Sequence, residues 1–289
     1  MHRTAALLAA LALVVSGCGG SGSGSAAPTT PVDHTQAPAQ RELLAKALAE
    51  FKRAPSGTYE SEVTADGVSQ PIAHENGSYR LRPPAAAYER AIAGIDPTSR
   101  KVRVQVVRVR GTANGRWFLQ LKEWGSWTGC WMSTDAPTIT KLTGVATAKD
   151  SRLPTAIAVL ARATVVGAGN GMSGPHLAVD AYSALQFLGV AAAAIEAERD
   201  VFTQTRVPVL LDVTANGSPA GAAVVGTQVV SALKAADVPV TPELSKFVSK
   251  TRARVVLGEL GQSVTVAAPA AAELLPRNPA ATSTCPANR

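Results

Sequence analysis

The strongest chemical signal in the sequence is Val15-Ser16-Gly17-Cys18, where small residues stand directly before a cysteine. Arg3 gives the chain a basic start, and an apolar run from Ala5 to Val15 leads into these residues. Such a run is too short to span a membrane as a helix and is typical of a signal peptide. Cleavage before Cys18 would leave its sulfur to carry a diacylglyceryl group, as at a bacterial lipobox. The alternative is an ordinary signal peptide with an A-x-A-like cleavage site.

A lipid-modified Cys18 would make the membrane the first partner of the chain. Two acyl chains on one residue hold a soluble domain stably on a bilayer, so we expect the protein at the extracytoplasmic face of the cell membrane. After loss of Arg3 with the signal peptide, 27 Lys and Arg stand against 21 Asp and Glu, and this balance of +6 favours an anionic membrane surface. Because the basic residues are spread along the chain and not clustered, nucleic acid is not an expected partner.

Two further cysteines, Cys130 and Cys285, remain after Cys18 is assigned to lipid. An even number of cysteines in an exported protein predicts a disulfide. The alternative is a pair of buried or reactive free thiols.

The residues that would support catalysis, metal binding or a cofactor do not form a recognisable pattern. The four histidines lack the spacing of metal ligands, and they are His2, His34, His74 and His176. No G-x-S-x-G or Ser-x-x-Lys element stands where a nucleophile would be poised. The glycine-rich run 169–174 matches G-x-G-x-x-G, but Pro175 follows it and no βαβ pattern surrounds it. We therefore expect no enzyme activity, no metal and no cofactor.

Composition divides the chain into four parts. A signal peptide at 1–17 is followed by the lipidated cysteine and a Gly/Ser/Pro-rich tether at 18–40, which cannot bury a core. One folded domain is expected over 41–276, and a polar tail over 277–289. Aromatic residues make up only 4% of the chain, so the core must consist mainly of Ala, Val, Leu and Ile.

Apolar residues alternate at a period of two in much of the domain, which predicts strands. The expected strands are Thr58–Thr64, Ser78–Arg82, Ala87–Ile92, Lys101–Arg110, Arg116–Leu121 and Val207–Val213. Asn-Gly or Asp-Gly pairs at 66, 76, 114 and 216 are typical of hairpin turns, so we expect an antiparallel meander. The apolar face switches between Val106 and Val107, which suggests a β-bulge or a strong bend.

Helices are expected where the apolar spacing changes to that of a helix. The ranges are Arg41–Arg53, Arg152–Ala163, His176–Glu198 and 241–250, the last beginning with a Thr241 cap and Pro242. The stretch 221–237 fits either a strand or a helix. Ala253–Leu257 and Ser263–Ala267 are expected to pair as a closing hairpin.

The apolar strand faces are the candidate lining of a ligand cavity. The residues are Val102, Val104, Val106, Trp117, Leu119, Leu121, Val209, Leu211 and Val213. All four tryptophans lie between 117 and 131. Their indoles could plug one end of the sheet, or they could form an aromatic lip on an apolar cavity, because indole suits a boundary between oil and water.

The closing stretch TRARVVLGELGQSVTVAAPA, residues 251–270, resembles the end of the actinobacterial LppX/LprG-type lipoproteins. In these proteins the last strands run up to a Gly and then to V-T-V-x-x-P. The resemblance covers about 41–276 in layout and is motif-specific at this stretch and at the lipobox. With the broader LolA-like carriers, it implies an α+β fold in which a strongly bent antiparallel sheet forms an unclosed half barrel, with helices across its concave face.

The resemblance also implies a function. Family members carry acyl chains of lipids, lipoglycans or lipoproteins in the cavity between sheet and helices. We therefore expect a membrane-anchored lipoprotein that binds or shuttles a lipid or other amphiphile. The alternative is a closed-core interaction lipoprotein that docks an envelope protein partner and carries no ligand. A void large enough for acyl chains would favour the first reading, and a packed interior would favour the second.

Overall fold

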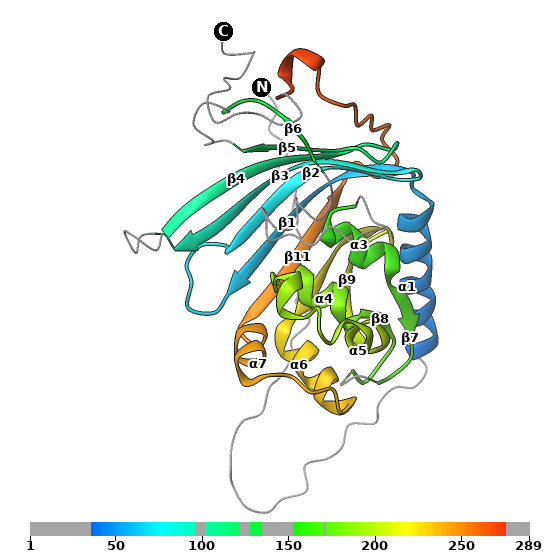
Figure 1. Ribbon diagram of the computed structural model, residues 1–289. Helices are drawn as coiled ribbons and strands as arrows, with labels where there is room; N and C mark the ends of the chain where they lie inside the picture. The colour runs from blue at the N-terminus through cyan, green and yellow to red at the C-terminus, as the bar shows by residue number, and fades with distance from the viewer. Residues whose placement is uncertain (1–35, 96–101, 122–127, 135–152, 170–171, 276–289) are drawn as a thin grey trace, which may run out of the picture. The chain divides into compact units, whose positions relative to one another are not determined.

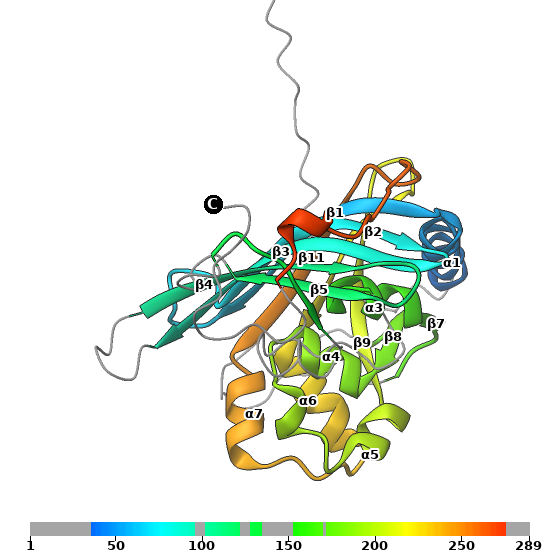
Figure 2. The ribbon, with the colours of Figure 1, turned by 45° about the horizontal axis from the view of Figure 1, so that its top comes forward.

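The fold is a single antiparallel sheet with helices on one side of it (Figures 1 and 2). The computed structural model describes residues 36–95, 102–121, 128–134, 153–169 and 172–275. The eleven strands follow one another in the order β6-β5-β4-β3-β2-β1-β11-β10-β9-β8-β7. In the described part of the chain, β6 and β7 are the two edge strands and do not pair with each other, so the sheet is unclosed. The predicted α+β class with an open antiparallel sheet is confirmed.

Six strands form the meander from β1 to β6, and five more continue the sheet beyond β1. Their bounds are β1 Ser56–Ala65, β2 Ala73–Leu81, β3 Pro84–Ile95, β4 Val102–Gly111, β5 Trp117–Leu121, β6 Met132–Thr134, β7 Thr164–Val166, β8 His176–Asp180, β9 Arg206–Val213, β10 Pro219–Val225 and β11 Thr251–Gly258. The last strand, β11, pairs with β1 on one side and with β10 on the other. It therefore joins the two halves of the sheet.

The helices lie on the face toward which the sheet curves (Figure 1). Their bounds are α1 Gln36–Arg53, α3 Thr155–Arg162, α4 Ala181–Phe187, α5 Arg199–Gln204, α6 Gly226–Ala235 and α7 Pro242–Val248, with single 3₁₀ turns η2 at Ala192–Ala194 and η3 at Ala271–Glu273. Within α1, the predicted apolar residues Leu44, Ala47, Leu48 and Phe51 are buried. The helix begins at Gln36 rather than Arg41, so the end of the predicted tether is helical.

Three of the four predicted glycine turns are confirmed, and one is wrong. Gly67, Gly115 and Gly217 adopt φ values of 79°, 91° and 84°, which favour glycine. Gly77 instead lies inside β2, opposite Tyr88 of β3. A Cβ at Gly77 would come within 2.6 Å of the Tyr88 Cβ. Glycine is therefore needed here for the close approach of two strands and not for a turn.

The predicted bulge between Val106 and Val107 is absent from the β3–β4 ladder. The register runs without a shift from Ala86–Gly111 to Ile95–Val102. Val107 and Val109 are buried in the core, so Val106, which is half-buried, faces the other side of the sheet. A register shift occurs instead between β9 and β10, at Pro219 and Gly221.

The predicted helix His176–Glu198 is wrong in its first part. Residues His176–Asp180 form β8, which is buried along its whole length. Asp180 then caps α4, because its carboxylate accepts a hydrogen bond of 2.8 Å from the Ser183 backbone N–H. The first five residues are buried as a strand of the sheet, and the helix α4 is confined to Ala181–Phe187.

The ambiguous stretch 221–237 contains both kinds of element. It continues β10 to Val225 and then forms α6 from Gly226. The helix over 241–250 is confirmed as α7, and the Thr241 hydroxyl accepts from Leu244 N–H at 3.2 Å. The predicted closing hairpin is wrong, because Ser263–Ala267 forms no strand and Ala253–Leu257 pairs within β11 to β1 and β10.

Candidate ligand-binding site

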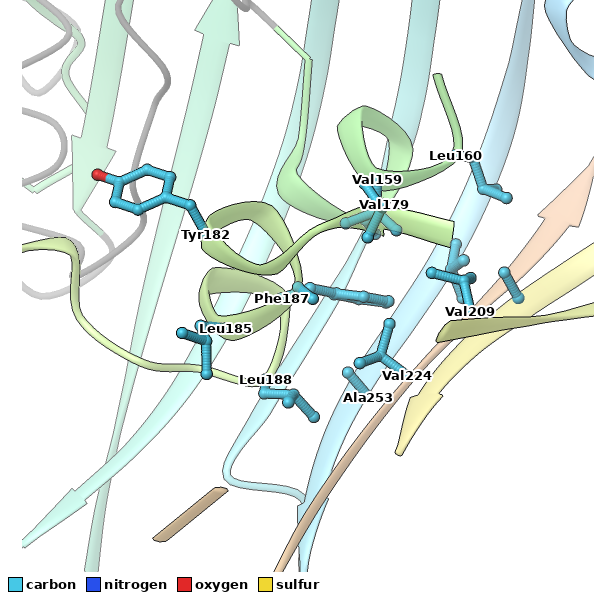
Figure 3. Packing of buried hydrophobic residues seen from close by; sticks show 14 of the residues in the cluster. Val159, Leu160, Val179, Tyr182, Leu185, Phe187, Leu188, Val209, Val224 and Ala253 are labelled. Carbon is cyan, nitrogen blue, oxygen red and sulfur yellow. The ribbon is translucent and has the colours of Figure 1, made fainter. Parts of the chain in front are cut away.

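The interface between the sheet and the helices is the place where an amphiphile would have to bind. Side chains of α4 point toward the strands in Figure 3, with Phe187 and Leu188 facing Val224 and Ala253, whereas the Tyr182 ring points away. One contiguous cluster of buried apolar residues fills this interface. Its walls come from helices α3, α4 and α6 and from strands on both sides of β11.

The predicted lining residues divide between the two faces of the sheet. Trp117, Leu119 and Val209 are buried in the core cluster, and Leu211 is half-buried against it. Val106 faces away from the core, as described above, and Val213 is half-buried outside the cluster. The side chains of Val102, Val104 and Leu121 lie outside the described residues. Of the six candidates whose side chains are described, four therefore lie at the interface.

The described part of the interface is packed. A void large enough for an acyl chain would leave the side chains on its walls partly accessible. Leu185, Leu188, Val224, Ala253 and Val255 instead have no exposed surface. In this state the sheet and the helices around these residues mesh as a protein core does.

A buried polar cluster lies within the same interface, on β1, β2 and β3. The Tyr59 hydroxyl donates to Glu75 Oε1 at 2.7 Å, and Arg90 Nη1 donates to Glu75 Oε2 at 3.3 Å. The side chains of Glu75 and Arg90 are only 3% and 13% exposed. Glu75 is therefore an ionisable group inside an apolar core, held by one cation and one hydroxyl.

The hydrogen-bonding capacity of this cluster is not fully used. Arg90 Nε and Thr155 Oγ1 are buried without a hydrogen-bond partner. Both residues, together with Glu75 and Phe187, line a void of about 10 Å³ beneath α3 and α4. A void of that size has room for about one water molecule. The interior therefore contains a small polar site with unmet donors under an apolar helix layer.

The tyrosines of the cluster are held in their neutral form. Burial, and then the charge of Glu75, raises the pKa of Tyr59 well above its ordinary value. Burial raises the pKa of Tyr88 in the same direction, with Glu75 adding to the shift. A neutral Tyr59 keeps its O–H available as a donor to Glu75 at physiological pH.

The tryptophan region is divided between the two sides of the sheet. Trp117 is part of the core, whereas Trp131 is buried under Arg110, whose guanidinium carbon lies 4.4 Å from the ring centre. Trp124 and Trp127 lie outside the described residues. In the part that is described, one indole fills the core and another supports a guanidinium.

The segment around η3 is tied to Trp131 by main-chain hydrogen bonds. Trp131 N–H donates to Glu273 O at 2.8 Å, and Leu275 N–H donates to Trp131 O at 2.9 Å. Cys130 is fully buried and packs with Leu275 and Met132. Figure 2 shows η3, in red, over the side of the sheet away from α4 and α6. Cys285 lies outside the described residues, so its pairing with Cys130 stays a prediction.

A surface groove of about 410 Å³ lies between this segment and the sheet. Its walls include Arg108, Arg110, Gln120, Trp131 and Glu273. Arg108 is paired there with Glu89, with 2.7 Å between Nε and Oε2. The groove is polar and lined by both signs of charge, so it does not offer the apolar surface that an acyl chain needs.

The anchor residue Cys18 lies outside the described residues. In the part of the chain that the structure covers, no helix is long and apolar enough to cross a membrane. The same residues include no group of three or more His, Cys, Asp or Glu side chains that could hold a metal ion.

Sequence reasoning missed the polar cluster around Glu75. Glu75 preceded the expected strand Ser78–Arg82, and Arg90 appeared to be an ordinary charged residue in Ala87–Ile92. The signal that could have found them is their register, since Glu75 and Arg90 are direct cross-strand partners of β2 and β3. Opposite charges at such positions attract, but the register depends on placing Gly77 inside the strand.

Comparison with known proteins finds similar solved structures, two of which are described here. The first is LprF from Mycobacterium bovis, with a TM-score of 0.39 and 15% identity over 81% of this chain and 98% of that chain. The second is LppX from Mycobacterium tuberculosis, with a TM-score of 0.35 and 12% identity over 80% of this chain and 99% of that chain. No family model matches the chain, and no curated protein matches it. The two structures are of mycobacterial lipoproteins of the LppX/LprG type, which the sequence was predicted to resemble.

Proposed function

We propose that the protein is a lipid-anchored lipoprotein on the extracytoplasmic face of the cell membrane, where it binds or shuttles a lipid or other amphiphile between its sheet and its helices. The observation that carries this proposal is the internal polar site at Arg90 and Thr155. A buried donor without a partner costs about 1–3 kcal/mol. A protein that needed only a stable core would become more stable if these buried polar groups were replaced by apolar ones. A ligand site needs them as hydrogen-bond partners for the ligand.

In this proposal acyl chains enter where the helix layer separates from the sheet. Each methylene group transferred from water gains about 0.8 kcal/mol. A chain of a dozen carbons would therefore offset the loss of several packing contacts between α4 and the strands. The polar end of the ligand would take up the hydrogen bonds of Arg90 and Thr155, which orients the ligand in the site.

A second candidate is an interaction lipoprotein with a closed core. The packing of Leu185, Leu188 and Val224 favours it, since these side chains leave no room for a ligand in the described state. In this candidate the void beside Thr155 holds a single water, and the surface of the domain contacts an envelope protein.

Ligand uptake separates the two candidates. The mature protein carrying Cys18→Ala, purified from its own host, is examined by native mass spectrometry for co-purifying lipid and by thermal unfolding with long-chain amphiphiles. Amphiphile binding predicts a mass adduct and a higher melting temperature in the presence of ligand. A protein that carries no adduct and whose melting is unmoved by every amphiphile supports the closed-core candidate.

Two variants test where the ligand binds. Leu211→Trp fills the interface and should abolish uptake, whereas Leu210→Trp, on the opposite face of β9, should leave uptake unchanged. Thr155→Val removes the unpartnered hydroxyl and should weaken ligand binding about 2–10-fold with no loss of stability. Equal binding by the wild type and Thr155→Val contradicts the role of the polar site.

The anchor is tested separately in cells. Cys18→Ala should release the protein from the membrane fraction or leave its precursor uncleaved. Membrane association of a processed Cys18→Ala protein would exclude the lipid anchor.

A further inference from the structure

One end of the domain brings together the turn after β1 and the end of α7. Asp66 N–H donates to Lys250 O at 2.8 Å, and Lys250 N–H donates to Phe247 O at 3.2 Å. These bonds fix the β1–β2 turn beside the last turn of α7, and Figure 1 shows the two elements next to each other. Val68 lies in that turn. We call Val68, Lys246, Phe247 and Lys250 the tip.

The tip exposes two large apolar side chains. Val68 is 52% exposed and Phe247 is 41% exposed. Ile72 in the same β1–β2 connection, and Val240 and Leu244 at the start of α7, are half-buried and pack against the core. The apolar core thus continues to the surface at this end, where exposed apolar side chains are costly in water and favourable at a bilayer interface.

The charges at the tip are nearly balanced. Lys246 and Lys250 are exposed, and so are Asp66 and Glu243 on the same two elements. Lysines next to apolar residues can extend their ammonium groups to lipid headgroups while the stems stay in the interface. Because the acidic residues offset this attraction, insertion of Val68 and Phe247 would provide most of the binding.

We propose that the tip docks on the surface of the lipid bilayer. This proposal rests on the lipid anchor proposed above, which makes the bilayer the surface always within reach. The predicted Gly/Ser/Pro-rich tether has 18 residues from Cys18 to Gln36 and would reach roughly 23 Å if it behaved as a flexible chain. A weak contact is sufficient, because the tether keeps the tip at a high effective concentration near the membrane.

Docking of the tip would place the β1–β2 turn and α7 at the headgroup level. Gly189, at the end of α4, lies next to Val63 and Ile72 on the strands that lead into this turn, since a Cβ there would be 3.7 Å and 3.9 Å from their methyl groups. Contact with the bilayer would therefore act on the end of the domain where α4 meets the sheet. An amphiphile could pass between bilayer and interface there without crossing water.

Hydrogen–deuterium exchange tests the docking independently of the natural anchor. The mature chain with Cys18→Ser and an N-terminal hexahistidine tag is attached to phosphatidylcholine/phosphatidylglycerol vesicles that contain a nickel-chelating lipid. Exchange of backbone amides is compared with that of the same protein in solution. Docking predicts at least threefold slower exchange in 66–72 and 243–250 on vesicles. The artificial tether separates this result from any failure of lipidation at Cys18.

Paired variants distinguish insertion of the tip from general crowding at the vesicle surface. Val68→Ser/Phe247→Ser should remove the protection. Val201→Ser/Val256→Ser changes two residues with similar exposure, 43% and 45%, away from the tip and should retain it. Protection that persists in the first variant, or is confined to other surfaces, overturns the proposal. Unchanged exchange of the wild type on vesicles overturns it as well.

Discussion

Tyr79 is a buried side chain whose hydroxyl is not used. Its ring packs between Phe51 of α1 and Tyr59 of β1, with ring centres 6.1 Å and 6.2 Å away. Its hydroxyl has no hydrogen-bond partner. Tyr182 differs, because its hydroxyl donates to Glu196 Oε2 at 2.8 Å. The hydroxyl of Tyr182 therefore forms a hydrogen bond, whereas that of Tyr79 forms none.

Replacing the two tyrosines by phenylalanine should have opposite effects at pH 7. Tyr79→Phe should leave the free energy of unfolding unchanged or raise it by up to about 1 kcal/mol, because it removes an unsatisfied polar group. Tyr182→Phe should lower it by about 1 kcal/mol through the lost hydrogen bond. Chemical denaturation measures both values, and a loss of more than 1 kcal/mol in Tyr79→Phe would show that its hydroxyl has a partner.

Alkaline pH should destabilise the fold through the same buried residues. Burial raises the pKa of Tyr79 above the ordinary value near 10, and burial together with the charge of Glu75 raises that of Tyr59. The folded state then keeps protons that the unfolded state releases. Stability is therefore complete below about pH 10 and falls as the pH rises above it. Tyr79→Phe should make this fall less steep, as measured by unfolding curves between pH 8 and 11.

The junction of β10 and α6 is decided by one glycine. Gly226 begins α6 where the chain passes α7 and β11. A Cβ there would overlap the carbonyl oxygen of Val248 and come within 2.7 Å of Thr251 O. Both obstacles are main-chain atoms, which cannot move as a flexible side chain does. The strand-to-helix change thus depends on a close contact with segments more than twenty residues away.

Gly226→Ala should therefore be strongly destabilising. We expect a loss of about 3 kcal/mol or failure to fold, because overpacking against backbone costs more than against side chains. Gly167→Ala is the matched control, since no heavy atom lies within 4 Å of its added Cβ, and it should change stability by less than about 0.5 kcal/mol. Urea unfolding compares the two, and equal stability would mean that the junction adapts without cost.

On the scale of the whole molecule, the C-terminal segment returns to the middle of the chain. Leu274 and Leu275 are held by the main chain of Trp131, and Leu275 packs on Cys130. Cys285 follows ten residues later. A disulfide between Cys130 and Cys285 would link the C-terminal segment covalently to the residues around Trp131. It would close a loop that contains more than half of the strands of the sheet.

We predict that Cys130 and Cys285 form a disulfide in the exported protein. A loop of about 155 residues contributes on the order of 4–5 kcal/mol on the chain-entropy model. Thiol titration of the unfolded, unreduced Cys18→Ala protein should find no free thiol, and reduction should lower the melting temperature. Two free thiols before reduction would refute the bond.

The parts of the fold that local chemistry determines were predictable from the sequence. Glycines at 67, 115 and 217 turn the chain because they allow positive φ, and this alone predicts much of the antiparallel meander. Thr241 and Pro242 predict the start of α7 in the same way. The signal peptide, the lipobox and the tether are likewise expectations from local composition, and Cys18 remains a prediction of that kind.

Only the tertiary structure determines the conformation of segments whose contacts with residues far away in sequence outweigh their local preference. His176–Asp180 was expected at the start of a helix but joins the sheet, because pairing with β7 and β9 buries it. Gly77 lies inside β2, where it is the cross-strand partner of Tyr88 in β3. The same register places Glu75 opposite Arg90. The candidate polar site therefore could not be predicted from either residue, since it exists only once β2 and β3 have paired. Periodicity identified apolar faces, but contacts between distant segments selected which face is the core.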